Sequence, residues 1–173
     1  MARRSFTLRS DALERDAEFS PDRVYRYAPR RRWDRTRPRC AFVLLNPSTA
    51  DERRDDPTIR RCIGFAADAG FGQAIVVNLF ALRATEPQVL RAARDPIGPE
   101  NDGAILHAAL GASAIVIGWG AWGARFRSRA DAVRLLLTPF GRRVFVLGQT
   151  RSGEPRHPLY LPARTRLRRE RGA

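Results

Sequence analysis

Four short apolar runs, rich in β-branched residues, constrain the fold of this 173-residue chain more than any other feature. They are CAFVLL (40–45), QAIVVNLF (73–80), AIVIGW (114–119) and RVFVLG (143–148). Such runs are typical of strands that are buried on both faces of a parallel sheet. Helical patterns alternate with them, one from Pro57 to near Gly70 and others over 100–110 and about 121–137. The alternation predicts an α/β fold, a three-layer α/β/α sandwich around a central, mainly parallel sheet of four to five strands.

The length fits one domain, which we divide by composition into three segments. Residues 1–39 form a basic N-terminal extension, with a possible outer strand at 22–27 and an irregular Arg/Pro-rich connection over 26–39. Residues 40–161 form the α/β core, and 162–173 form an arginine-rich tail.

The net charge of +14 lies mainly at the two ends of the chain. Residues 1–39 hold 12 arginines against 6 acids, and 151–173 hold 7 against 2, whereas 40–150 hold 13 against 10. A near-neutral core with basic ends predicts a surface that binds a polyanion such as nucleic acid. The alternative is a charged surface that serves solubility alone.

Several classes of protein do not fit the sequence. No apolar run approaches the ~20 residues of a membrane-spanning helix, and the N-terminus lacks the apolar core of a secretory signal. Cys40 and Cys62 have no CxxC spacing, so neither a disulfide framework nor a zinc or iron–sulfur site is indicated. We expect a protein of the bacterial cytoplasm with no metal and no cofactor.

Polar and glycine residues follow the four apolar runs, where an open parallel sheet binds its ligands. Asn46 follows the first run, Asn78 lies in the second, Gly118-Trp119-Gly120 closes the third, and the loop after the fourth leads to His157. An asparagine amide suits a water or the edge of a base, although an asparagine at the end of a strand is usually just a turn residue. His157, held by Pro158, suits a donor to developing negative charge, or else a loop histidine bonded to backbone.

The charged residues near these ends also have two interpretations. Asp51 is the acid nearest Asn46 and could assist a water, while Asp55 or Asp56 is expected to cap the helix that begins near Pro57. Arg83 could contact a phosphate or simply be solvated.

The combination LLNPSTADE, DDPTIRRC, VVNLFALRAT, DPIGPEND, WGAWG and RHPLYL over residues 40–161 resembles a widespread bacterial family of small domains of uncharacterised activity. A more distant resemblance is to the uracil-DNA glycosylase superfamily. Leu44-Leu45-Asn46-Pro47-Ser48 resembles the Gly-Ile-Asn-Pro-Gly motif of its mismatch-specific branch. Asn78 and Arg83 have the spacing of the second motif in the thermostable branch, and Ile117 to Ala121 resembles a later small-residue turn. His157-Pro158-Leu159-Tyr160-Leu161 resembles the last motif, His-Pro-Ser-Tyr-Leu.

The resemblance implies a site that excises a base flipped out of the nucleic-acid stack. Asn46 would position the attacking water with help from Asp51, and His157 would stabilise charge on the departing base. Asn78 would read the base edge. Substrate contacts are expected from Pro47, Ser48, Phe80, Arg83, Gly118, Trp119, Gly120 and Tyr160.

The sequence departs from the superfamily at several positions. Ser48 replaces a glycine and Leu159 a small residue, and both the first-motif aspartate of the most active branch and the iron–sulfur cysteines are missing. The aromatic that stacks on the base is not identified, with Phe80, Phe65 and Trp119 as candidates.

The leading hypothesis is a DNA-directed, metal-independent N-glycosylase-like protein of DNA repair, acting on a damaged or modified base. The alternatives are a non-catalytic nucleic-acid or nucleotide-binding module of the same fold and a hydrolase of free nucleosides or nucleotides.

Overall fold

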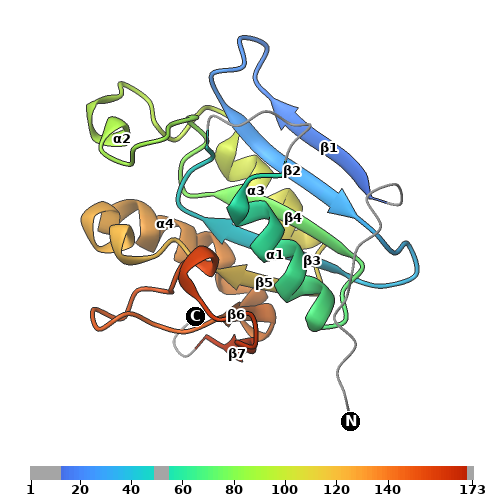
Figure 1. Ribbon diagram of the computed structural model, residues 1–173. Coiled ribbons are helices and arrows are strands. Elements are labelled where there is room, and N and C mark those ends of the chain that lie inside the picture. The colour runs from blue at the N-terminus through green and yellow to red at the C-terminus, as the bar shows by residue number, and fades with distance from the viewer. Residues whose placement is uncertain (1–12, 49–54, 171–173) are drawn as a thin grey trace.

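A seven-stranded mixed sheet forms the centre of the computed structural model, which describes residues 13–48 and 55–170 (Figure 1). The strand order is β1-β2-β4-β3-β5-β6-β7. The strands are β1 (Glu14–Phe19), β2 (Arg26–Arg32), β3 (Arg39–Leu44), β4 (Gln73–Asn78), β5 (Ala114–Ile117), β6 (Val144–Val146) and β7 (Arg168–Arg169).

Strands β4, β3, β5 and β6 run parallel, and each is formed by one of the four apolar runs of the sequence, although the runs continue past the strand ends. Strands β1, β2 and β7 pair antiparallel with their neighbours. The predicted α/β class is therefore confirmed, but the sheet is mixed and larger than the predicted four to five strands. The added strands come from the segments that were set apart as N-terminal extension and C-terminal tail.

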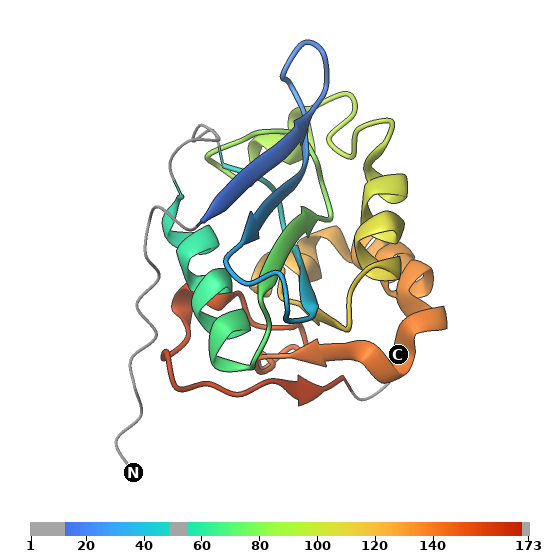
Figure 2. The ribbon, with the colours of Figure 1, turned by 90° about the vertical axis from the view of Figure 1, so that its right-hand side faces the viewer.

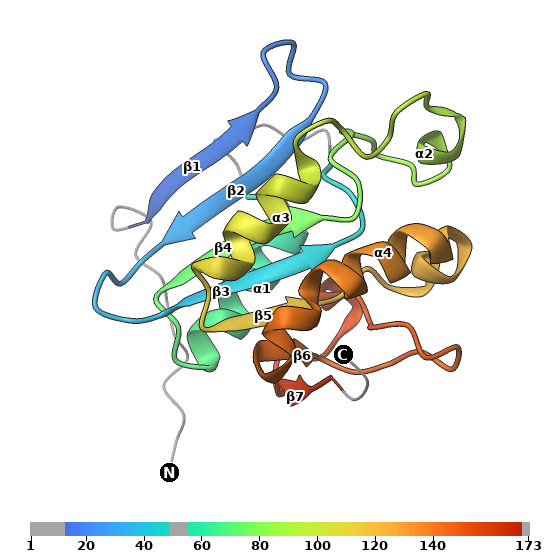
Figure 3. The same cartoon turned by 180° about the vertical axis from the view of Figure 1, so that it is seen from behind.

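Helices cover both faces of the sheet, as Figure 2 shows. Helix α1 (Pro57–Asp68) packs on one face, and helices α3 (Asn101–Leu110) and α4 (Arg127–Leu137) lie over the other, in front of the sheet in Figure 3. Short helical segments are α2 (Val89–Ala92), η2 (Ala121–Phe126), η3 (Thr138–Arg143) and η4 (Pro158–Tyr160). No helix among the described residues has the length and apolar character needed to cross a bilayer.

Alternating side chains of the parallel strands divide the core into two clusters. Phe42, Val76 and Val116 pack with the buried face of α1. Their neighbours Val43 and Val77 belong to the cluster under α3 and α4. Each central strand is therefore apolar on both faces, which explains the unbroken apolar runs.

Helix α1 begins and ends as its sequence predicts. The Asp56 carboxylate accepts a hydrogen bond from the Ile59 amide at 2.8 Å, which caps the helix, and Pro57 occupies its first turn. The helix stops before Gly70, whose φ of 90° favours glycine. The buried residues are those with helical apolar spacing: Ile59, Cys62, Ile63, Phe65 and Ala66.

The prediction of an irregular connection over 26–39 was wrong for its first half. Arg26–Arg32 forms β2, which pairs with both β1 and β4. The buried positions of this strand include Arg26 and Arg31, only 5% and 3% exposed. Both arginines form ion pairs with aspartates next to α1, so the charges that argued against a strand are neutralised inside the fold. Pro29 is tolerated because the pairing with β4 begins only at Arg30.

Candidate functional site

A cleft of about 620 Å³ opens at the carboxyl ends of the parallel strands, and we call it the carboxyl-edge cleft. Strands β4 and β5 both follow β3 in the chain but pair on opposite sides of it. Open α/β sheets bind ligands where the strand order reverses in this way. The loops after β3, β5 and β6 each line the cleft. The cleft therefore lies at the carboxyl edge of the sheet, where the sequence predicted a ligand site.

Asn46 lies in the wall of the cleft, with its side-chain amide fixed by the backbone of two loops. Its Nδ2 donates to the Ala84 carbonyl at 2.8 Å and to the Pro47 carbonyl at 3.1 Å. These two bonds use both amide protons, so the Oδ1 atom is the group of this side chain left to accept a hydrogen bond from a ligand or water. The geometry leaves Asn46 with an acceptor of fixed orientation.

His157 lines the same cleft and has a defined tautomer. Its Nδ1 atom accepts a hydrogen bond from the Leu159 amide at 3.2 Å, so a neutral ring carries its proton on Nε2. Burial lowers the pKa of His157 to about 4, although the nearby Asp56 carboxylate opposes the shift. At neutral pH the side chain is therefore an uncharged hydrogen-bond donor.

The low pKa of His157 makes stability depend on pH. The imidazole pKa is about 4 in the folded protein against an ordinary value of 6.5, so the unfolded chain binds more protons between these values. The stabilising contribution of the neutral ring is fully present above pH 6.5 and is lost as the pH falls towards 4. It amounts to about 3 kcal/mol. Denaturant unfolding at pH 7 and pH 4 should show a decrease in unfolding free energy that is smaller in His157→Gln by about this amount. The exposed His107→Gln control should behave like wild type, and equal decreases in all three proteins would contradict the assignment.

Two glycines allow the loop that carries His157 to approach β5 closely. A Cβ on Gly118 would lie 3.1 Å from Cδ of Pro158 and 3.2 Å from the Arg156 carbonyl. Gly120 has a φ of 78°, and a Cβ there would lie 3.2 Å from Cβ of His157. Gly120 lines the cleft, whereas Gly118 is buried and does not line it.

The aromatic residues of the cleft differ from those expected to stack on a base. Phe65 and Phe80 are 4% and 3% exposed and belong to the two core clusters. Trp119 reaches the cleft lining but is 1% exposed, and its indole nitrogen donates to Glu154 at 2.7 Å. Tyr160, 75% exposed with its ring 5.8 Å from that of His157, and the half-buried Trp122 are the aromatic side chains available to a ligand.

The structure brings only part of the predicted site together. Of the predicted residues, Asn46, Ser48, Trp119, Gly120, His157 and Tyr160 line the carboxyl-edge cleft. Pro47, Phe80 and Gly118 are buried and do not line it. Arg83 donates to the Arg23 carbonyl at the turn between β1 and β2. Asp51 lies outside the described residues.

Asn78 ends β4 at the predicted edge of the sheet but does not line the carboxyl-edge cleft. It is 2% exposed, and its backbone carbonyl accepts a hydrogen bond from Asn101 at 3.0 Å. Its Nδ2 atom has no hydrogen-bond partner within the described part of the chain. The prediction that Asn46, Asn78 and His157 surround one cleft therefore fails for Asn78.

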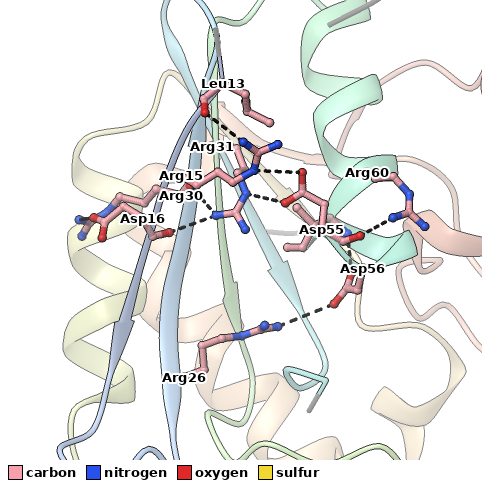
Figure 4. Close-up of polar contacts among 10 residues, drawn as sticks. Leu13, Arg15, Asp16, Arg26, Arg30, Arg31, Asp55, Asp56 and Arg60 are labelled. Atoms are coloured by element: carbon pink, nitrogen blue, oxygen red, sulfur yellow. Dashed lines mark hydrogen bonds and ion pairs between the residues drawn. The ribbon is translucent and has the colours of Figure 1, made fainter. Parts of the chain in front are cut away.

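Ser48 connects the cleft to an ionic cluster of Arg15, Arg26, Arg31, Asp55 and Asp56. Figure 4 shows these arginines and aspartates. Its hydroxyl donates to Asp56 Oδ2 at 2.8 Å, and the same oxygen lies 3.9 Å from the Arg26 guanidinium. Beside this pair, Arg31 Nε lies 2.6 Å from Asp55 Oδ1, and Arg15 approaches the other oxygen of Asp55 at 4.0 Å. The cluster holds the start of α1 against β2 and so fixes one wall of the cleft.

Several residues of the cleft were not predicted from the sequence. They are Leu45, Thr58, Ala84, Thr85, Glu86, Pro87, Ala121, Trp122, Thr150, Arg156 and Leu159. The best available signal was proximity in sequence, because Arg156 precedes His157 and Thr58 lies in the first turn of the helix after Asn46. Arg156 is exposed and forms no ion pair with the described residues.

No group of three or more potential metal-binding His, Cys, Asp or Glu side chains occurs in residues 13–48 and 55–170.

Comparison with known proteins identifies the family of the chain. No curated protein matches significantly. No solved structure matches significantly either. A family model described as "Protein of unknown function (DUF1643)" matches residues 26–159, which include β2 to β6 and most of the carboxyl-edge cleft. The chain therefore belongs to the DUF1643 family.

Proposed function

We propose that this protein is an N-glycosylase-like hydrolase that removes a damaged or modified base from DNA, with the base held in the carboxyl-edge cleft. The observation that carries the proposal is the pairing of two groups of opposite hydrogen-bonding character in one cleft. Asn46 offers an acceptor of fixed orientation, and the neutral His157 offers a donor.

The reaction needs these two groups in different roles. Water attacks C1′ of the sugar, the bond from C1′ to the base nitrogen breaks, and its electron pair leaves with the base. Asn46 Oδ1 accepts a hydrogen bond from the water and orients it, and the proton that the water loses passes to solvent. The Nε2–H of His157 donates to the departing base while negative charge builds on it. The base then takes a proton from solvent, so the step releases a neutral base and an abasic sugar.

The remaining cleft residues fit a nucleotide unit. Tyr160 and Trp122 offer faces for stacking on a base, which is worth about 1–3 kcal/mol per base in single-strand binding. Arg156 adds a positive charge for a neighbouring phosphate. The C-terminal segment that leaves the cleft after Tyr160 carries four exposed arginines, which extend this charge away from the cleft: Arg164, Arg166, Arg168 and Arg169.

A second candidate is a non-catalytic module that binds a nucleotide or nucleic acid in the same cleft. The position of Asn78 favours it, because the residue expected to read the base edge is buried away from the carboxyl-edge cleft. Both candidates require a base in the cleft, and only the first requires bond cleavage.

The test is a screen for abasic product. Duplexes and single strands that carry uracil, hypoxanthine, xanthine or an oxidised pyrimidine are incubated with the protein and then treated with alkali, which cleaves at abasic sites. We expect cleavage for at least one base, with the same yield in the presence of a chelator. Binding without abasic product from any substrate would favour the binding module. If the protein neither binds these nucleic acids nor releases a base from them, nucleic acid is not its ligand.

A further inference from the structure

A second, smaller pocket lies at the opposite end of the parallel strands, and we call it the amino-edge pocket. Its volume is about 370 Å³. Arg32, Gln73 and Arg39 occupy adjacent positions in one cross-strand row, since Gln73 pairs with Arg32 on β2 and with Arg39 on β3. Residues directly opposite each other on neighbouring strands project on the same face of a sheet. Two guanidinium groups therefore flank one neutral amide at the mouth of this pocket.

The positive charge of this row is incompletely neutralised. Arg39 Nε donates to Oε1 of Gln73 at 3.1 Å, and no carboxylate of residues 13–48 or 55–170 lies within ion-pair distance of the guanidinium. Arg32 is 3.5 Å from Glu14, but Glu14 is closer to Arg35, at 2.6 Å. Glu14 thus pairs with both Arg32 and Arg35, whereas Arg39 forms a hydrogen bond with the Gln73 amide and no ion pair within the described residues.

Two carboxylates and two further arginines also line the amino-edge pocket: Glu14, Asp16, Arg15 and Arg30. Arg30 projects on the same face, two residues before Arg32, and pairs with Asp16 at 3.1 Å and with Glu18. Its charge is therefore already compensated. The pKa of Arg39 is lowered, mainly by burial of the guanidinium and further by the positive charges of Arg30 and Arg32. The second cause shows that excess positive charge surrounds Arg39.

We propose that the amino-edge pocket binds a phosphate group between Arg32 and Arg39. The planar guanidinium presents paired N–H donors that match two oxygens of a phosphate, and two such groups compensate its charge. The Arg39 guanidinium lies against the end of α3, because a Cβ built on Gly111, the residue after the helix, would be 2.5 Å from Nη1 of Arg39. His107 lines the pocket from the same helix.

The amino-edge pocket is separate from the carboxyl-edge cleft. The two sites lie at opposite ends of β4, whose six residues span about 17 Å from Gln73 to Asn78. The inference does not depend on the proposed glycosylase activity. The phosphate has two possible sources, a small phosphorylated molecule or the phosphodiester backbone of a nucleic acid, and the experiment below separates them.

The test is calorimetric titration of the full-length protein with inorganic phosphate at low ionic strength, with chloride of equal ionic strength as the reference. Wild type should bind phosphate saturably. Arg39→Gln should weaken binding at least tenfold and Arg32→Gln several-fold. Arg127→Gln removes the same charge from an exposed position at the start of α4, outside both pockets, and should change the affinity less than twofold. Circular dichroism of each variant establishes that it is folded, and Arg32→Gln is the second readout if Arg39→Gln does not fold.

Equal affinity in Arg39→Gln, Arg32→Gln and Arg127→Gln, or heat no greater than that with chloride, would overturn the proposal. Competition then identifies the source of the phosphate. Displacement by a short single-stranded oligonucleotide, weakened in Arg39→Gln, assigns the pocket to a phosphodiester backbone. Displacement by a sugar phosphate but not by the oligonucleotide assigns it to a small molecule. Both outcomes support a phosphate site.

Discussion

His157→Ala should lower the rate of base release about 100- to 1000-fold, equivalent to about 3–4 kcal/mol of transition-state stabilisation. The expected loss is large because His157 is a half-buried, neutral donor whose other ring nitrogen already accepts a hydrogen bond from the Leu159 amide. The Nε2–H donor of His157 therefore does not have to reorient when charge develops on the departing base. Single-turnover measurement of abasic product reports this step directly.

Asn46→Ala should give a comparable loss for a different reason, because it removes the acceptor that orients the water. It also removes the bonds to the Ala84 and Pro47 carbonyls, so the folded state of the variant must be checked by its unfolding midpoint. Asp131→Ala is the control, since Asp131 is exposed on α4 and lines neither pocket. Product formation at an unchanged rate in both His157→Ala and Asn46→Ala would contradict the proposed mechanism.

Asp55→Ala should lower the free energy of unfolding by about 3–5 kcal/mol, the usual cost of removing one partner from a buried ion pair. The Arg31 side chain is 4% exposed and its Nε lies 2.6 Å from Oδ1 of Asp55, which is itself only 12% exposed. The substitution leaves the guanidinium charge inside the fold without this carboxylate. Denaturant unfolding monitored by circular dichroism measures the change.

The double variant Arg31→Met/Asp55→Leu should recover most of this loss, because apolar residues of similar volume often replace a buried pair at little cost. Asp16→Ala is the control, since its pair with Arg30 is 65% exposed on the aspartate side and should contribute no more than about 1 kcal/mol. Asp55→Ala and Asp16→Ala of equal stability would show that the cluster does not hold α1 against β2.

The central part of the fold was predictable from sequence because one physical cause dominates there. Strands buried on both faces require unbroken apolar runs, and the ends of those runs placed Asn46 and His157 at one edge of the sheet. The start of α1 was predictable from local chemistry alone, through Asp56 and Pro57.

The remaining elements depend on contacts between distant parts of the chain. Strand β2 was missed because the charges of Arg26 and Arg31 are compensated by Asp56 and Asp55, which come more than twenty residues later. Arg83 has the spacing expected of a substrate contact, but its side chain turns to the Arg23 carbonyl on the β1–β2 turn. Sequence spacing fixes the position of a residue along the chain but not the direction of its side chain.

The most direct test of the central claim is nitrogen NMR of the two histidine side chains at neutral pH, with free nucleobases added in turn. The absence of phosphate in these ligands leaves His107, which lines the amino-edge pocket, as an internal reference. The account predicts that His157 is neutral with its proton on Nε2 and that this nitrogen shifts saturably with at least one base, while His107 does not move. A His157 that is charged, or protonated on Nδ1, or unmoved by every base would contradict it.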